Sequence, residues 1–92
     1  MLEELYQVIE ERKRNPPKGS YTARLLYGEK GLNSILEKFG EEAVEVILAV
    51  KDGKREEIIH EVADLIYHLL VLLSKLEIKL DDVYDELRRR RK

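Results

Sequence analysis

The sequence predicts an all-α fold, an antiparallel bundle of four to five helices. Apolar residues recur every three or four positions in several segments, which is helical spacing. Proline and glycine separate these segments, and no segment shows the alternation of a strand. The chain of 92 residues is long enough for a single domain, 1–92. A helical unit of this size buries a modest share of its surface, so we expect dimerisation to complete the bundle.

The first 14 residues are predicted to form a helix. Their apolar side chains recur at helical spacing: Leu2, Leu5, Tyr6, Val8 and Ile9. Asn15 precedes Pro16 and Pro17, and a residue before proline avoids helical geometry, so this helix ends there. Residues 16–20 follow as a loop.

A short helix and then a long one are expected next. Ser20 or Thr22 can cap the short helix, which runs through about Tyr27 and ends at Gly28. Residues 31–50 form the long helix, because apolar residues recur along it: Leu32, Ile35, Leu36, Phe39, Ala43, Val46, Ile47 and Val50. Gly40 inside this helix indicates close packing or a bend, since glycine costs about 1 kcal/mol relative to alanine there.

A tight turn joins the long helix to the central helix of the chain. Gly53 closes the turn as glycine does just past a helix end, and residues 54–75 form the central helix. So short a connection makes the two helices antiparallel neighbours. A final helix is capped by Asp81 or the residue before it, with three side chains directed inward: Val83, Tyr84 and Leu87.

Composition excludes several classes of protein. The net charge is −2, which lacks the basic excess of nucleic-acid-binding proteins, so no nucleic-acid partner is expected. The last five residues, 88–92, are all basic, so residues 1–87 carry −7, whereas residues 12–24 contain five basic groups and no acid. That basic segment could meet phosphates. The chain has no cysteine, so a metal site would need oxygen or histidine ligands.

Targeting and membrane signals are also missing from the sequence. The N-terminal residues lack the pattern of a signal peptide, and Asp64 and His68 interrupt the longest apolar run. We therefore expect a cytoplasmic protein with no membrane partner.

Five acidic residues flank the tight turn, and they are the candidate functional residues. Glu41, Glu42 and Glu45 precede the turn, and Glu61 and Asp64 follow it. Residues three or four apart share a helix face, so the two sets would meet as a box of carboxylates between the helices. Carboxylates held together repel one another, whereas Mg²⁺ prefers oxygen ligands and commonly adds substrate phosphates. The pattern therefore predicts a metal and phosphate site.

Structural alternatives remain open for each of these groups. In a chain with 19 acidic residues, a run such as Glu41-Glu42 can simply be a solvated helix face. Asp64 lies among apolar residues and could instead form a structural ion pair with Lys38 or an arginine. His68, one turn from Asp64, could be a core histidine with a satisfied hydrogen bond.

Four blocks of sequence carry a resemblance to a known family. They are Leu5-Tyr6-x-Val8-Ile9-x-x-Arg12, Asn15-Pro16-Pro17-x-Gly19-Ser20-Tyr21-Thr22, Lys38-x-Gly40-Glu41-Glu42-Ala43-x-Glu45 and Glu61-x-Ala63-Asp64-Leu65-x-Tyr67-His68. The acid pattern resembles the MazG-like all-α nucleotide pyrophosphohydrolases. Together the four blocks resemble the phosphoribosyl-ATP pyrophosphatases of histidine biosynthesis, and they span nearly the whole chain. The resemblance implies hydrolysis of phosphoribosyl-ATP to phosphoribosyl-AMP and pyrophosphate by a homodimer.

The resemblance also implies roles for individual residues. Glu42, Glu45, Glu61 and Asp64 would bind Mg²⁺, for which Mn²⁺ is a possible substitute, and Glu41 would hold a second metal or orient the attacking water. Lys38 would contact phosphate. Arg12, Ser20, Tyr21 and Thr22 would bind substrate, and His68 and Tyr67 would support the metal ligands.

Two other functions remain open from the sequence. A house-cleaning hydrolase of free nucleoside triphosphates would share the acid box. A non-catalytic helical dimerisation module would use the same acids only in ion pairs with the 17 basic residues.

Overall fold

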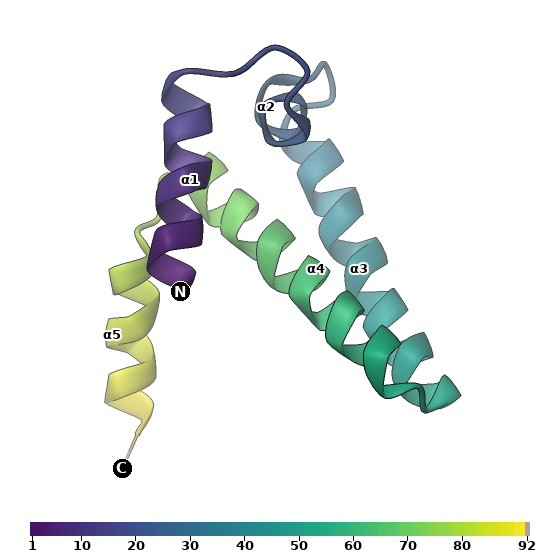
Figure 1. The fold of residues 1–92 in the computed structure, drawn as a ribbon. Helices are drawn as coiled ribbons and strands as arrows, with labels where there is room; N and C mark the ends of the chain where they lie inside the picture. Colours follow the sequence, from purple (N-terminus) through teal and green to yellow (C-terminus); the bar gives the residue numbers. More distant parts are fainter. Residues whose placement is uncertain (92) are drawn as a thin grey trace.

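The computed structural model describes residues 1–91, which form five helices and no strand (Figure 1). The helices are α1 (Leu2–Arg14), α2 (Tyr21–Tyr27), α3 (Leu32–Asp52), α4 (Arg55–Lys75) and α5 (Leu80–Arg90). The predicted all-α class is confirmed. None of the helices in the described residues is long and apolar enough to cross a membrane. Lys92, the end of the basic run, lies outside the described residues.

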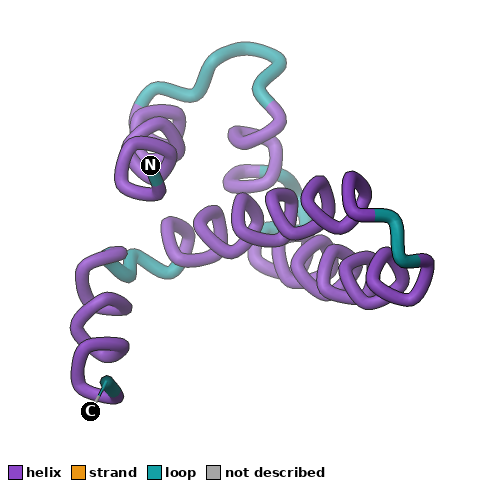
Figure 2. The backbone as a smooth tube through the Cα atoms, turned by 60° about the horizontal axis from the view of Figure 1, so that its bottom comes forward, coloured by secondary structure: helices purple, strands orange, loops and turns teal. Residues whose placement is uncertain are grey.

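Helices α3 and α4 form the antiparallel hairpin that the tight turn predicts (Figures 1 and 2). Gly53 adopts the left-handed conformation at φ 74°, and its N–H bonds to the carbonyl oxygens of Ala49 and Val50 at 3.0 and 3.1 Å. Glycine enters this region without the steric cost that a Cβ imposes. The two helices make the most extensive contact of any helix pair, so the hairpin is the frame of the molecule.

The core lies where α1 and α2 pack against the C-terminal half of α4 and the start of α3. Its fully buried side chains include Ile9, Leu26, Ile35, Leu70 and Val71. The face of α1 that was predicted to be apolar supplies Tyr6 and Ile9, whereas Val8 lies on the exposed side. Short helix α2 is therefore held over α4 by burial rather than by its own length, which is too short for independent stability.

Helix α5 differs from the prediction in its N-cap and in the exposure of Leu87. It begins at Leu80, with Lys79 at the N-cap and no side-chain cap, so the expected cap at Asp81 or the residue before it is wrong. Leu80 is buried in the core. The helix therefore begins at Leu80, before the position that the expected cap implied. Leu87 was expected to face inward but is 57% exposed, because α5 projects away from the hairpin (Figures 1 and 2).

Candidate active site

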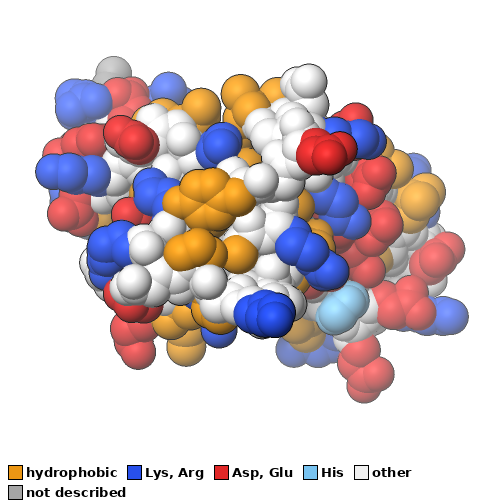
Figure 3. Space-filling model, turned by 90° about the horizontal axis from the view of Figure 1, so that it is seen from above, with side chains coloured by type: hydrophobic (Ala, Val, Ile, Leu, Met, Phe, Trp, Pro, Cys, Tyr) orange, Lys and Arg blue, Asp and Glu red, His pale blue; other side chains and the backbone are white. Residues whose placement is uncertain are grey.

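Three carboxylates meet between α3 and α4. Glu45 and Glu61 stand eight residues on either side of Gly53, so the antiparallel hairpin brings them to the same level. Glu42 lies one turn before Glu45, and the three side chains place carboxylate oxygens within 4.8 Å of one another. Figure 3 shows acidic side chains gathered on the side where the hairpin runs, next to a histidine and bordered by basic side chains. The structure thus brings together three members of the predicted box.

Burial makes this cluster electrostatically costly. Glu42 is only 6% exposed, and the Oε2 atoms of Glu42 and Glu61 are buried without a hydrogen-bond partner in the described chain. Sharing a hydrogen with the Glu45 carboxylate raises the pKa of Glu61 to about 7, and desolvation and the like charges of Glu45 and Glu42 act in the same direction. An uncompensated buried carboxylate is unfavourable, so the cluster is chemically suited to a cation.

Asp64 belongs to a second group of possible metal ligands on α4. Carboxylate oxygens of Asp64 and Glu61 lie within 4.8 Å of a ring nitrogen of His60, and the His60 Nε2 to Asp64 Oδ2 distance is 3.4 Å. Glu61 is therefore common to both groups. Sequence reasoning missed His60, although its position four residues before Asp64 places the two on one helix face.

Glu41 does not join either group of acids. It is exposed and pairs with Lys38, whose Nζ lies 3.3 Å from Glu41 Oε2 and 3.9 Å from Glu42 Oε1. The hydrogen bond to Glu41 raises the pKa of Lys38. The ammonium group of Lys38 thus lies at the edge of the acid cluster, next to Glu42, its most buried member.

The residues predicted to bind substrate line a hollow beside α4. This hollow has a volume of about 320 Å³, and its lining includes Arg12, Lys18, Ser20, Tyr21, Thr22 and Tyr67. Ser20 caps α2 by accepting a hydrogen bond from the N–H of Ala23 at 3.2 Å, which settles the choice of cap. The two cations make the hollow suited to an anionic ligand.

Two side-chain hydroxyls of α2 that were predicted to bind substrate contact α4. Tyr21 Oη lies 3.0 Å from Nε2 of His68, and Thr22 Oγ1 is hydrogen-bonded to Tyr67 Oη. Burial raises the pKa of the Tyr21 hydroxyl. The nearby charge of Glu42 acts in the same direction, and that of Lys38 in the opposite direction. Tyr21 therefore lines the hollow and lies near Lys38 and Glu42, and its hydroxyl faces a histidine.

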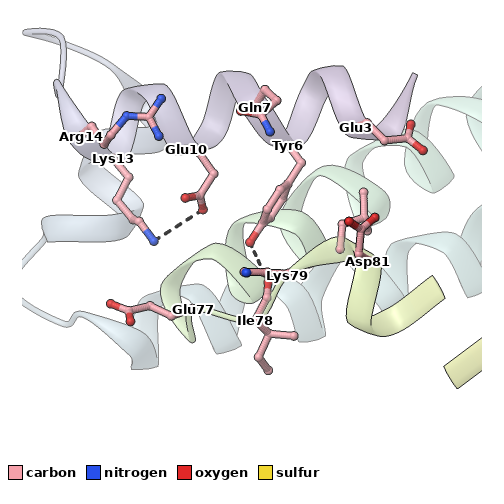
Figure 4. A pocket seen from close by; sticks show the side chains of 11 residues that line it. Glu3, Tyr6, Gln7, Glu10, Lys13, Arg14, Glu77, Ile78, Lys79 and Asp81 are labelled. Atoms are coloured by element: carbon pink, nitrogen blue, oxygen red, sulfur yellow. Dashed lines mark hydrogen bonds and ion pairs between the residues drawn. The ribbon is translucent and has the colours of Figure 1, made fainter. Parts of the chain in front are cut away.

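A separate hollow of about 530 Å³ lies between α1 and the turn after α4 (Figure 4). Several of its lining groups have partners: Glu10 contacts Lys13 at 3.5 Å and accepts a hydrogen bond from Ser74 at 2.6 Å, and Tyr6 Oη donates to the Ile78 carbonyl at 2.7 Å. None of the residues predicted for the site lines it. The hydrogen bonds of Glu10 and Tyr6 join α1 to the end of α4 and to the turn after it.

Known proteins similar to this chain point to one family. Residues 2–91 match the family model described as phosphoribosyl-ATP pyrophosphohydrolase. A phosphoribosyl-ATP pyrophosphatase of Haloarcula marismortui is 56% identical over 99% of this chain and 93% of its own length, and one of Methanococcoides burtonii is 54% identical over 99% and 92%. The histidine biosynthesis bifunctional protein HisIE of Pyrococcus furiosus is 54% identical over the whole chain, which spans 42% of that protein. The chain belongs to the phosphoribosyl-ATP pyrophosphohydrolase family.

Proposed function

We propose that this chain hydrolyses phosphoribosyl-ATP between its α and β phosphates, with Mg²⁺ as the cofactor, to give phosphoribosyl-AMP and pyrophosphate. The observation that carries the proposal is the buried, unpartnered Oε2 of Glu42, which shares its site with Glu45 and Glu61. A structural ion pair leaves no such orphaned acceptor, whereas a divalent cation satisfies it. The family membership of residues 2–91 supports the choice of substrate.

The described side chains have distinct tasks in this reaction. Glu42, Glu45, Glu61 and Asp64 would hold the metal, and Mn²⁺ could replace Mg²⁺ on the same oxygen ligands. A bound divalent ion would neutralise charge that develops on the phosphate oxygens. Exposed Glu41 remains the candidate for a second metal or for orienting the attacking water.

Cations on both sides of Tyr21 are placed to bind the phosphates of the substrate. Lys38 stands beside Glu42, and Arg12 and Lys18 line the hollow at the start of α2. Charge-assisted hydrogen bonds from such groups to phosphate are roughly twice as strong as neutral ones. The substrate would therefore span from the hollow to the acid cluster.

Pyrophosphate release from phosphoribosyl-ATP tests the proposal directly. We expect turnover with Mg²⁺ and its loss on adding a chelator. Turnover that persists in chelator would refute the metal requirement. A panel of plain nucleoside triphosphates belongs in the same assay, because a preference for one of them would favour the house-cleaning function instead.

Amide variants test the site itself. Glu61→Gln and Asp64→Asn each remove a charged ligand with little change in shape, so turnover should fall by at least about 100-fold while the helical circular dichroism persists. Glu56→Gln, an exposed acid on the same helix, is the matched control and should remain active. Full activity in both site variants would overturn the assignment.

We also propose that the active protein is a homodimer. Several large apolar side chains of the hairpin are more than half exposed in the described chain: Val44, Ile47, Leu48, Val50 and Ile59. Val44, Ile47 and Leu48 are also neighbours at helical spacing on α3, and adjoining exposed apolar side chains are typical of an interface. A second copy would cover it, and the same hairpin would then carry both the interface and the acids.

A further inference from the structure

The N-terminus of α2 is fastened to α4 by two hydroxyl contacts in succession. Tyr21 meets His68, and Thr22 meets Tyr67, so adjacent residues of one helix pair with adjacent residues of the other. Thr22 and His68 are 1% and 5% exposed, although Tyr21 is 40% exposed. Each of the two contacts therefore includes one buried group, Thr22 or His68, which is costly to leave unpaired.

The direction of these hydrogen bonds follows from the backbone of α4. His68 Nδ1 lies 2.7 Å from the carbonyl oxygen of Asp64, and a carbonyl oxygen only accepts, so Nδ1 carries the hydrogen. In the neutral imidazole, Nε2 is then an acceptor, and the Tyr21 hydroxyl donates to it. The only hydrogen of that hydroxyl is engaged within the protein, and none is left for a substrate phosphate.

The three rings also pack against one another. Tyr67 and His68 lie edge to face, with centroids 5.1 Å apart, and the Tyr21 and Tyr67 rings are stacked at 6.3 Å. The guanidinium carbon of Arg24 lies over the Tyr21 ring, 5.7 Å from its centroid. Such contacts fix ring orientation as well as distance. Tyr21, the residue after loop 16–20, is therefore held in place by His68. His68 lies one helical turn after Asp64 on α4.

We infer that His68 and Tyr67 are positioning residues, which act through Tyr21 and Thr22 to hold the cationic hollow in register with the acid cluster. This inference rests on the proposed function and reassigns the two hydroxyls from binding substrate to holding the loop that binds it. Arg12 and Lys18 then contact the substrate, and the hydroxyls determine where Lys18 stands. The ordering of the loop is completed before the substrate arrives, which lowers the entropic cost of binding.

A measurement without substrate tests the anchor. Trypsin cleaves after lysine, and Lys18 is exposed in the loop. Tyr21→Phe removes only the anchoring hydroxyl, so cleavage between Lys18 and Gly19 should become faster, on the order of fivefold, as the loop opens more often. Tyr84→Phe is the matched control, because it removes one tyrosine hydrogen bond of 3.0 Å, to Glu3, far from the loop. Equal cleavage rates in the two variants would overturn the inference.

Steady-state kinetics separate positioning from catalysis. In Tyr21→Phe, KM for phosphoribosyl-ATP should rise severalfold while kcat changes little, since the hydroxyl contacts no reacting atom. His68→Gln keeps an acceptor near the position of Nε2 and should stay closer to wild type than His68→Asn, which does not reach Tyr21. A fall in kcat with KM unchanged in Tyr21→Phe would contradict the assignment.

Nitrogen NMR of His68 in the wild type tests the direction of these hydrogen bonds even if a variant fails to fold. We expect Nδ1 of His68 to carry the hydrogen and Nε2 to have the shift of a hydrogen-bonded acceptor; the opposite tautomer would overturn the inference. The cleavage and NMR results need no turnover. A chain that releases no pyrophosphate would therefore refute the proposed function while these two readouts still decide the anchor.

Discussion

At the scale of single residues, Glu61 is the group whose charge depends most on its neighbours. Its pKa is raised from 4.5 to about 7, chiefly by its hydrogen bond with Glu45. The folded chain then binds this proton more tightly than the unfolded chain between those two values. The contribution of Glu61 to the free energy of unfolding is therefore fully present below pH 4.5 and is lost as the pH rises through about 7.

Urea denaturation in the presence of a chelator should display this loss. Between pH of about 5 and about 8, the wild type should lose more stability than Glu61→Gln, because the amide has no proton to release in that range. Parallel stability curves for the two proteins would show that the Glu61 carboxylate titrates at its ordinary pKa.

Protons and metal should compete for the same carboxylates. Ligands must lose their protons before they bind a cation, so the rise in melting temperature caused by Mg²⁺ should be larger at a pH of about 8 than at about 6. Wild type and Glu56→Gln should respond alike, since Glu56 is exposed on α4 and outside both groups of acids. No Mg²⁺ effect at either pH would favour a non-catalytic module.

Helical spacing and the short turn predicted that acids of the two helices would meet, but they did not separate Glu41 from the acids that do meet. Glu42 and Glu45 face Glu61 because the hairpin aligns them, as expected from the short turn. Glu41 is one residue away from Glu42, and that rotation about the helix turns it outward to Lys38. His60 went unnoticed although it lies four residues before Asp64, because one exposed histidine at that spacing is a weak signal by itself.

At the scale of helices, side chains cap the C-terminal ends of α1, α2 and α4, and each of these helices donates a hydrogen bond to a carbonyl of another. Tyr27 of α2 donates to the carbonyl of Lys13 in α1 at 2.6 Å, and Lys75 of α4 donates to the carbonyl of Leu26 in α2 at 2.8 Å. Lys13 in turn donates to the carbonyl of Ser74 in α4 at 2.8 Å. The last carbonyls of a helix have no partner inside it, and these donors help to satisfy them. The Ser74 carbonyl also accepts a hydrogen bond from the N–H of Glu77 at 3.1 Å.

Removing one of these three capping hydrogen bonds should lower the free energy of unfolding measurably. Lys75→Met keeps much of the aliphatic stem but leaves the Leu26 carbonyl without its donor, which should cost about 1–3 kcal/mol in urea denaturation. Lys54→Met is the control: it loses only an exposed ion pair with Glu57 and should change stability by less than about 1 kcal/mol. Equal effects would mean that water satisfies the Leu26 carbonyl.

The helices themselves were predictable because their signals are local. Asn15 before two prolines and Gly53 after an apolar stripe end α1 and α3 within about two residues of the expected positions. The start of α5 was not predictable, since Leu80 is drawn into a core formed by distant residues. The three capping hydrogen bonds could not be predicted from the sequence either, because lysines and a tyrosine at helix ends have many possible partners.

At the scale of the whole molecule, the hairpin has a face that the described chain leaves open. Leu36, Gly40, Val44 and Ile47 follow one another at helical spacing along α3, and the three apolar side chains are all exposed. The Gly40 backbone has open space where a Cβ would stand, so no close packing within this chain explains the glycine. A helix of a second copy could approach there, and a two-fold axis would bring the same face of both chains together.

A charge placed on this face should separate the two copies. Val44 is 53% exposed here, so Val44→Lys strains nothing within one chain but would bury an unpaired ammonium in a dimer interface. Sedimentation should show a dimer for the wild type and a monomer for Val44→Lys, and the melting temperature of the wild type should rise with protein concentration. Asn33→Lys, an exposed change at the start of the same helix, should remain dimeric. If Val44→Lys stayed dimeric, the interface would have to lie on a surface other than this face of α3.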